Sequence, residues 1–342
     1  MKKVCICGGG ALGHVIAGYL SARGKADVSI LTNHPSDWQH EITIFTPDNI
    51  HNKFVGKIEC ISSDPKEVLA DAEVVLLCLP GFLIKKELLK IKDYLKEGAY
   101  LGSVFSSTGF FFEALEILDD KIPLWGFQRV PFISRVNSYG CSANLLGYKK
   151  SHHIAVERDS EENKELFRQW VEFAFERPTL LLNNYLEASL TNSNPILHTS
   201  RLYTMFIDWR PGKYYPHNIL FYEEWTDNAA DMLIQMDAEF FKLLSVLPVT
   251  SDYLPTILNY YESIDARTLA NKLSSISSFQ GILSPMKEEP AGWVPDFSSR
   301  YFVEDFEFGL KYIWQLAHKY NISVPNIDKV YTWGCWAVSQ NR

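Results

Sequence analysis

GGGALG, residues 8–13, is the stretch that decides the fold class of this chain of 342 residues. An apolar run at Lys3–Cys7 precedes it, a segment with helical spacing extends from Ala11 to Arg23, and a second apolar run follows at Ala26–Leu31. Apolar runs on either side of a helix predict a βαβ unit with parallel strands. In that setting a G-x-G-x-x-G pattern is typical of a dinucleotide-binding turn, whereas the same pattern alone is a weak signal.

The glycines of this turn have separate expected roles. Gly8 permits the tight turn, Gly10 lets a diphosphate approach the backbone, and Gly13 lets the helix pack closely on the strand. The amides and dipole of the helix then face the diphosphate. The residues predicted to bind it are Gly8, Gly10, Ala11, Leu12 and Gly13.

The end of the second apolar run bears on which dinucleotide binds. NAD-specific folds usually place Asp or Glu there to bond the ribose hydroxyls, but this chain has Thr32-Asn33-His34. No carboxylate would repel a 2′-phosphate at this point, although no arginine is present to clamp one. We therefore expect Thr32 and Asn33 to contact the cofactor, and we favour NADP(H) while NAD(H) stays open. Pro80, which follows a Val- and Leu-rich run at Ala72–Leu79, is expected to line the nicotinamide ribose.

Two patterns divide the chain. Strand and helix signals alternate up to about residue 180, and long helical periodicity dominates afterwards. We therefore predict an α/β domain with a Rossmann-type parallel sheet in residues 1–180 and an all-helical substrate domain in residues 181–342. In the second half, the spacing predicts one long helix over Tyr185–Phe206 that is interrupted by Pro195, and a loop over Leu283–Ser299.

The bulk composition argues against several classes of protein. Hydrophobic residues make up 46% and charged residues 22%, with a net charge of -8, as is typical of a soluble globular protein. No apolar run reaches the roughly 18 residues of a membrane span, and no Lys/Arg block indicates a nucleic-acid surface. Without a recognisable signal peptide we expect a cytoplasmic location. The six cysteines are scattered, so neither a disulfide framework nor a metal site is predicted.

Three side chains of the second half have the types that a reductase needs. His198 lies four residues after Asn194, and Arg300 and Asp305 both belong to the stretch RYFVED. A histidine can donate a proton near the reducible carbon, a carboxylate can orient and charge that histidine, and a cation can bind a substrate carboxylate. Each residue also has an ordinary structural interpretation: packing for His198, helix capping for Asp305 and a surface ion pair for Arg300.

The glycine loop, the stretch NPILH (residues 194–198) and the stretch SRYFVEDFEFGL (residues 299–310) together resemble the octopine/nopaline dehydrogenase family of opine dehydrogenases. Such enzymes join a 2-oxo acid such as pyruvate to the amino group of an amino acid and reduce the imine with NADH or NADPH. The resemblance implies that His198 is the acid–base group, that Asp305 pairs with it, and that Arg300 holds the oxo-acid carboxylate. Asn194, which heads the N-P-x-x-H motif, is expected in the same substrate site.

Other assignments stay open. Arg135, in a probable strand end at Gln128–Arg135, could bind a substrate carboxylate or form an ion pair. A ketopantoate-reductase-like or 2-hydroxyacid dehydrogenase shares the two-part organisation, but ketopantoate reductases have a catalytic lysine in the long helix, and no lysine occurs between Lys164 and Lys213. A dinucleotide sensor without turnover would need only the glycine loop. The aromatic-rich helical half could also supply the face of a homodimer.

Overall fold

The chain forms two compact units in a computed structural model that describes residues 2–47, 52–250 and 254–340. Unit one is Met1–Ser189 and unit two is Leu190–Arg342. The short helix α6 (Tyr185–Ser189) packs on strands of unit one. The functional division at residue 180 stays a prediction. Among the described helices, none combines the length and the apolar character that crossing a bilayer requires.

The central sheet of unit one has, in its described part, the strand order β12-β11-β8-β7-β6-β1-β2-β5. Its strands are β1 (Lys2–Cys7), β2 (Ala26–Leu31), β5 (Cys60–Ser62), β6 (Val74–Leu77), β7 (Tyr100–Ser103), β8 (Leu124–Phe127), β11 (His152–Glu157) and β12 (Thr179–Leu181). Neighbours pair in parallel except β8 with β11. The strand order reverses at β1, and open α/β sheets bind dinucleotides at such a point.

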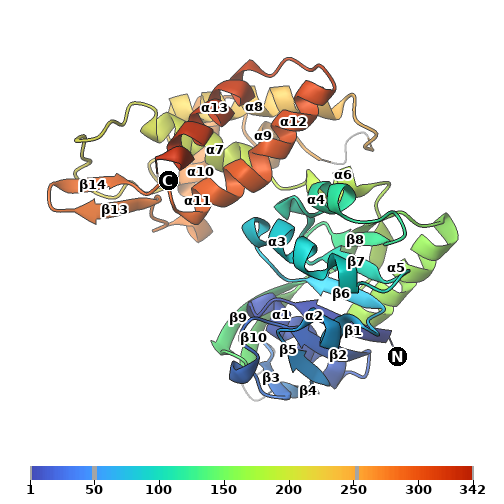
Figure 1. Cartoon of the computed structure of the whole chain (residues 1–342). Coiled ribbons are helices and arrows are strands. Elements are labelled where there is room, and N and C mark those ends of the chain that lie inside the picture. Colours follow the sequence, from blue (N-terminus) through green and yellow to red (C-terminus); the bar gives the residue numbers. More distant parts are fainter. Residues whose placement is uncertain (1, 48–51, 251–253, 341–342) are drawn as a thin grey trace. The chain divides into compact units, whose positions relative to one another are not determined.

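Helices cover both faces of this sheet (Figure 1), so each central strand contributes to two cores. Val4 and Ile6 of β1 enter the core on one face, while Cys5 and Cys7 enter the core on the other. Burial on both faces explains why β6 is a continuous Val- and Leu-rich run. The helices are α1 (Ala11–Ala22), α2 (Pro65–Leu69), α3 (Gly81–Ile91), α4 (Phe110–Ile117) and α5 (Glu161–Phe175). The predicted Rossmann-type sheet is confirmed.

A second sheet, which the sequence did not predict, packs against α1. Its strands are β3 (Glu41–Phe45), β4 (Lys53–Lys57), β9 (Phe132–Ser138) and β10 (Ser142–Tyr148). A Cβ atom built on Gly18 would lie 2.6 Å from the Ile44 side chain, so the missing side chain lets helix and sheet approach closely. Arg135 lies within β9, exposed, and donates to the Ser134 carbonyl oxygen at 3.2 Å. Our expectation that Arg135 ends a ligand-presenting strand of the central sheet is therefore wrong.

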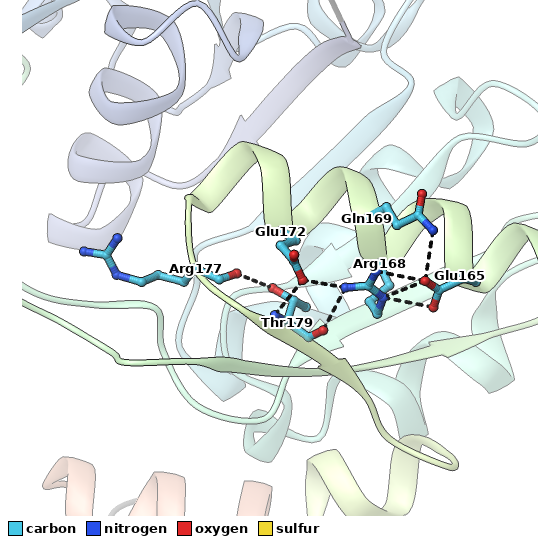
Figure 2. Close-up of polar contacts among 6 residues, drawn as sticks. All are labelled: Glu165, Arg168, Gln169, Glu172, Arg177 and Thr179. Atoms are coloured by element: carbon cyan, nitrogen blue, oxygen red, sulfur yellow. Dashed lines mark hydrogen bonds and ion pairs between the residues drawn. The ribbon is translucent and has the colours of Figure 1, made fainter.

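Polar side chains tie the last strand of the central sheet to α5 (Figure 2). Arg168 donates to the Glu165 carboxylate on its own helix and, at 2.9 Å, to the Thr179 carbonyl oxygen of β12. The Thr179 amide in turn donates to Glu172 at 3.1 Å. Because β12 is only three residues long, it makes few backbone hydrogen bonds to β11. The side-chain hydrogen bonds to α5 therefore help to hold this strand on the sheet.

Unit two is mainly helical in its described part. Its helices are α7 (Asn194–Phe206), α8 (Asp227–Leu244), α9 (Ile257–Tyr260), α10 (Ala266–Ser275), α11 (Arg300–Phe302), α12 (Lys311–Lys319) and α13 (Pro325–Ser339). The hairpin β13 (Met286–Glu289) and β14 (Gly292–Pro295) lies in the stretch that was predicted to be a loop. The helical prediction for this half is confirmed, with that hairpin as an addition.

The single helix predicted over Tyr185–Phe206 is wrong. One helix ends at Ser189 and the next begins at Asn194, so Pro195 lies in the first turn of α7 and does not interrupt a helix. Proline is favoured there because the first amides of a helix have no intrahelical partner and its fixed φ suits the helix. The next two backbone amides, those of Ile196 and Leu197, both donate to the Ser193 carbonyl oxygen.

Asp305 lies inside a π-helical segment, η5 (Val303–Leu310), so the alternative interpretation of this residue as a helix cap does not hold. A Cβ on Gly309 would lie 2.7 Å from the Pro195 ring, and one on Gly334 would lie 2.0 Å from Phe306. Glycine at these two positions therefore lets η5 lie very close to both α7 and α13. π-helical turns are rare and are frequent at functional sites, and this one brings Asp305 to α7.

Candidate active site

The glycine loop of unit one has the geometry that a dinucleotide turn requires. Gly8 adopts φ +115°, and its amide donates to the Leu31 carbonyl oxygen at 3.1 Å. A Cβ on Gly13 would lie 2.2 Å from the Gly8 carbonyl oxygen, so only glycine allows the helix to pack this closely on the strand. Gly10, by contrast, has open space where its side chain would be. The backbone is thus tight at the first and third glycines and free at the second, as expected if a ligand approaches Gly10.

The start of α1 fits a bound diphosphate. Gly10 occupies the N-cap, no side chain caps the helix there, and its first turn contains no acidic residue. The amides of Ala11 and Leu12 lie in this first turn, where helix amides and the dipole favour an anion. These residues would hold the diphosphate of a nicotinamide dinucleotide.

The other predicted cofactor residues lie at ends of central strands. Thr32 directly follows β2 and is buried, with its hydroxyl accepting from the His34 amide at 3.3 Å, whereas Asn33 is exposed. Pro80 is the N-cap of α3, three residues after β6 ends. Each position is on the carboxyl side of a parallel strand, where this class of sheet binds ligands.

His14, which the sequence analysis did not predict as a site residue, contacts the glycine loop through its ring. Its ring is fully buried, with Nδ1 donating to the Gly10 carbonyl oxygen at 3.0 Å and Nε2 accepting from the Gly140 amide at 2.8 Å. Burial lowers the pKa of His14, which agrees with a neutral ring in these roles. The ring also stacks on Trp38 at 4.1 Å. His14 therefore joins the glycine loop to the β9–β10 turn of the second sheet.

In unit two, His198 and Asp305 form a buried pair. The His198 Nδ1 and the Asp305 Oδ2 are 2.9 Å apart, and their side chains are 10% and 14% exposed. The two residues are 107 positions apart in the chain, and the packing of η5 on α7 brings them together. Because an ionised carboxylate only accepts, the His198 Nδ1–H donates to Asp305, which fixes the tautomer and leaves Nε2 for chemistry.

The second ring nitrogen of His198 contacts a residue that the sequence did not indicate. The His198 Nε2 lies 2.9 Å from the hydroxyl of Tyr222, and Tyr222 is only 7% exposed. Burial is the main cause that raises the pKa of this phenol above its usual range. The faces and edges of the imidazole contact Phe221 and Tyr301, with ring centroids 5.3 and 5.0 Å away. No spacing or motif signal in the sequence pointed to Tyr222.

Arg201 connects α7 to the turn that carries Tyr222. It lies three residues after His198 and is 3% exposed. Its guanidinium donates to the Phe221 carbonyl oxygen at 3.1 Å and to the Glu224 carbonyl oxygen at 2.7 Å. Burial lowers the pKa of Arg201 to about 10. The backbone on both sides of Tyr222 is therefore bonded to the same helix as His198.

The predicted substrate residues occupy two different settings. Arg300 is exposed at the start of α11, five residues before Asp305. Asn194 is half-buried at the start of α7, one turn before His198. Its backbone amide donates to the Asn192 Oδ1 at 3.2 Å. Both belong to unit two with the His198–Asp305 pair, whereas Arg135 belongs to unit one. Among the described residues, no group of three or more His, Cys, Asp or Glu side chains is arranged to hold a metal ion.

Comparisons with known proteins indicate which enzymes the chain resembles. Residues 181–338 match the family model of the NAD/NADP octopine/nopaline dehydrogenase alpha-helical domain. An octopine dehydrogenase of Mizuhopecten yessoensis is 25% identical over 97% of this chain and 88% of its own length, and a tauropine dehydrogenase of Arabella iricolor is 26% identical over 97% and 90%. The predicted resemblance to the octopine/nopaline dehydrogenase family is confirmed.

A solved octopine dehydrogenase in complex with NADH and L-arginine has the same fold. Its TM-score is 0.84 at 23% identity, and the match covers 99% of this chain and 90% of that one. The comparisons confirm the predicted activity class, an NAD(P)-dependent oxidoreductase of the opine dehydrogenase type, and the predicted cofactor class. These findings argue against a sensor without turnover.

Proposed function

We propose that the chain catalyses the NAD(P)H-dependent reductive condensation of a 2-oxo acid with the amino group of an amino acid, with His198 as the acid–base group. The observation that carries this assignment of roles is the His198–Asp305 pair at 2.9 Å, in which both side chains are largely buried. A largely buried carboxylate at Nδ1 stabilises an imidazolium and leaves Nε2 as the nitrogen that exchanges a proton. The similarity to octopine and tauropine dehydrogenases supports the reaction class.

Each residue has a distinct task in the reaction. A reduced nicotinamide, held by the glycine loop of unit one, would supply hydride to the carbon of the imine. His198, protonated at Nε2, provides the proton that neutralises charge developing on the oxygen or nitrogen of the reacting group. Asp305 keeps Nδ1 protonated and holds the ring orientation. In the oxidative direction, neutral His198 takes the proton back at the same nitrogen.

Two residues of unit two are proposed to bind the substrate. Arg300 has a planar guanidinium suited to a carboxylate, is exposed, and lies five residues from Asp305 in the matched stretch. Asn194 lies at the amino end of the helix that carries His198. Arg135 remains a weaker proposal, because it lies in the second sheet of unit one.

The cofactor preference, location and assembly complete the proposal. We favour NADP(H), because Thr32-Asn33-His34 follows β2 without a carboxylate that would repel a 2′-phosphate. A cytoplasmic location and a homodimer are proposed from the sequence.

The test is the loss of reduced-nicotinamide absorbance with a panel of 2-oxo acids, each with and without a panel of amino acids, using NADPH and NADH separately. We expect consumption that requires both substrates, and we expect His198→Asn to abolish it while cofactor affinity is kept. Consumption with the oxo acid alone would instead assign a hydroxyacid dehydrogenase. Full activity in His198→Asn would remove the acid–base role.

A further inference from the structure

We propose that Tyr222 is a catalytic residue of this enzyme and that the proton of His198 reaches the substrate through the Tyr222 hydroxyl. This inference rests on the proposed acid–base role of His198. The observation behind it is the 2.9 Å contact between the His198 Nε2 and the Tyr222 hydroxyl. An imidazole nitrogen makes one in-plane hydrogen bond, so while this contact persists the substrate cannot also bond to Nε2.

The surroundings of His198 leave the hydroxyl as the remaining route for a proton. Nδ1 is bonded to Asp305, and the ring contacts Phe221 and Tyr301. Among the described residues, the polar partner at Nε2 is the Tyr222 hydroxyl. A hydroxyl can accept from Nε2–H and donate its own hydrogen at the same time, because it has one donor and two acceptor positions.

Contacts on several sides fix Tyr222 in place. They argue against the alternative that its side chain moves away from His198 when a substrate binds. Its ring stacks on Phe279 at 4.2 Å and lies nearly parallel to Trp225 at 5.9 Å. Arg201 bonds the backbone at Phe221 and at Glu224, on both sides of Tyr222. Moving the hydroxyl far from Nε2 would break these stacked contacts or would strain a turn that is bonded to α7.

The proton transfer is balanced and changes no oxidation state. The Tyr222 O–H bond breaks as its proton passes to the substrate oxygen or nitrogen, and the His198 Nε2–H bond breaks as that proton passes to the Tyr222 oxygen. The phenol is restored, His198 is left neutral, and Nδ1–H stays bonded to Asp305. Burial makes a lasting phenolate unfavourable and raises the pKa of Tyr222, so the two protons move together.

The test compares Tyr222→Phe with a matched variant, Tyr215→Phe. Tyr215 is a partly buried tyrosine of the same unit whose hydroxyl bonds to the Met205 carbonyl oxygen at 3.2 Å, so its variant also loses one hydroxyl contact. With the substrate pair from the panel, we expect Tyr222→Phe to lower kcat by about 10² or more while the dissociation constant of the reduced nicotinamide is kept. Tyr215→Phe should keep wild-type kcat.

The number of protons transferred in the rate-limiting step gives a second readout, which can be measured on the wild-type enzyme as well as on the variant. In mixtures of H2O and D2O, the wild-type rate should follow a curved proton inventory, as expected for two protons, and Tyr222→Phe should follow a straight line. A straight wild-type inventory, or Tyr222→Phe with kcat at or above the wild-type value, would overturn the relay. Failure of the acid–base role itself would show separately, as retained activity in His198→Asn.

Discussion

Replacing Asp305 by Asn tests how much the buried charge of this carboxylate contributes to catalysis. The variant keeps an oxygen that can accept from the His198 Nδ1–H, so the geometry is largely preserved while the negative charge is lost. The nearest atoms are 2.9 Å apart and both side chains are less than 15% exposed, so solvent screens the pair weakly. Charge centres roughly 4 Å apart at an effective dielectric constant of about 20 interact by about 4 kcal/mol.

An imidazolium that loses about 4 kcal/mol of stabilisation corresponds to a drop in turnover of about 10³. The assay is the initial rate of reduced-nicotinamide consumption with saturating oxo acid and amine, together with fluorescence titration of cofactor binding and thermal unfolding. The matched control is Asp328→Asn, because Asp328 pairs with His318 at 3.4 Å in the same unit, yet both side chains are at least 44% exposed. Turnover of Asp305→Asn within about threefold of wild type, with normal folding, would refute the assigned role.

Three further predictions concern cofactor binding and stability. Gly10→Ala should unfold at the wild-type temperature, because nothing lies within 4 Å of the added Cβ. In a fluorescence titration the variant should nevertheless bind NADH and NADPH at least about tenfold more weakly, because the Cβ would lie where the diphosphate approaches the backbone. Unchanged affinity would show that the diphosphate binds elsewhere. His152 is buried without a hydrogen-bond partner among the described residues, and burial lowers its pKa to about 4 from 6.5. The unfolded state is therefore protonated first, so the stability contribution of neutral His152 is complete above pH 6.5 and is lost as the pH falls towards 4, by about 3 kcal/mol in total. Urea unfolding of wild type and His152→Phe between pH 7 and pH 4.5 checks this, and equal acid slopes would contradict it. The Glu239 carboxylate accepts from the Asn326 and Ile327 amides at the start of α13, so Glu239→Gln should lower the free energy of unfolding by about 1–3 kcal/mol; an unchanged urea midpoint would show that the bonds add nothing.

The local signals of the first unit were sufficient to predict its central sheet. Lys3–Cys7 and Ala26–Leu31 are apolar because most of their side chains enter the cores beside the sheet, and Gly13 is required by a contact with the Gly8 carbonyl oxygen, five residues away. Interactions of such short range are encoded in adjacent residues. The second sheet escaped prediction because β3, β4, β9 and β10 come from two distant segments, and α1 is the surface on which they pack.

The sequence alone also determined which residue types are available for chemistry: a glycine turn for a dinucleotide, a histidine after N-P-x-x, and an aspartate and an arginine in one stretch. Only the tertiary structure decided how they act. The resemblance implied that Asp305 pairs with His198, but the packing that makes this pair came from the structure: Pro195 begins a helix, and η5 takes a π-helical form against the Pro195 ring. Tyr222 acquires its contact with His198 because Arg201 bonds the backbone of its turn. Both results depend on side-chain packing between segments far apart in the chain, which no local pattern of residues records.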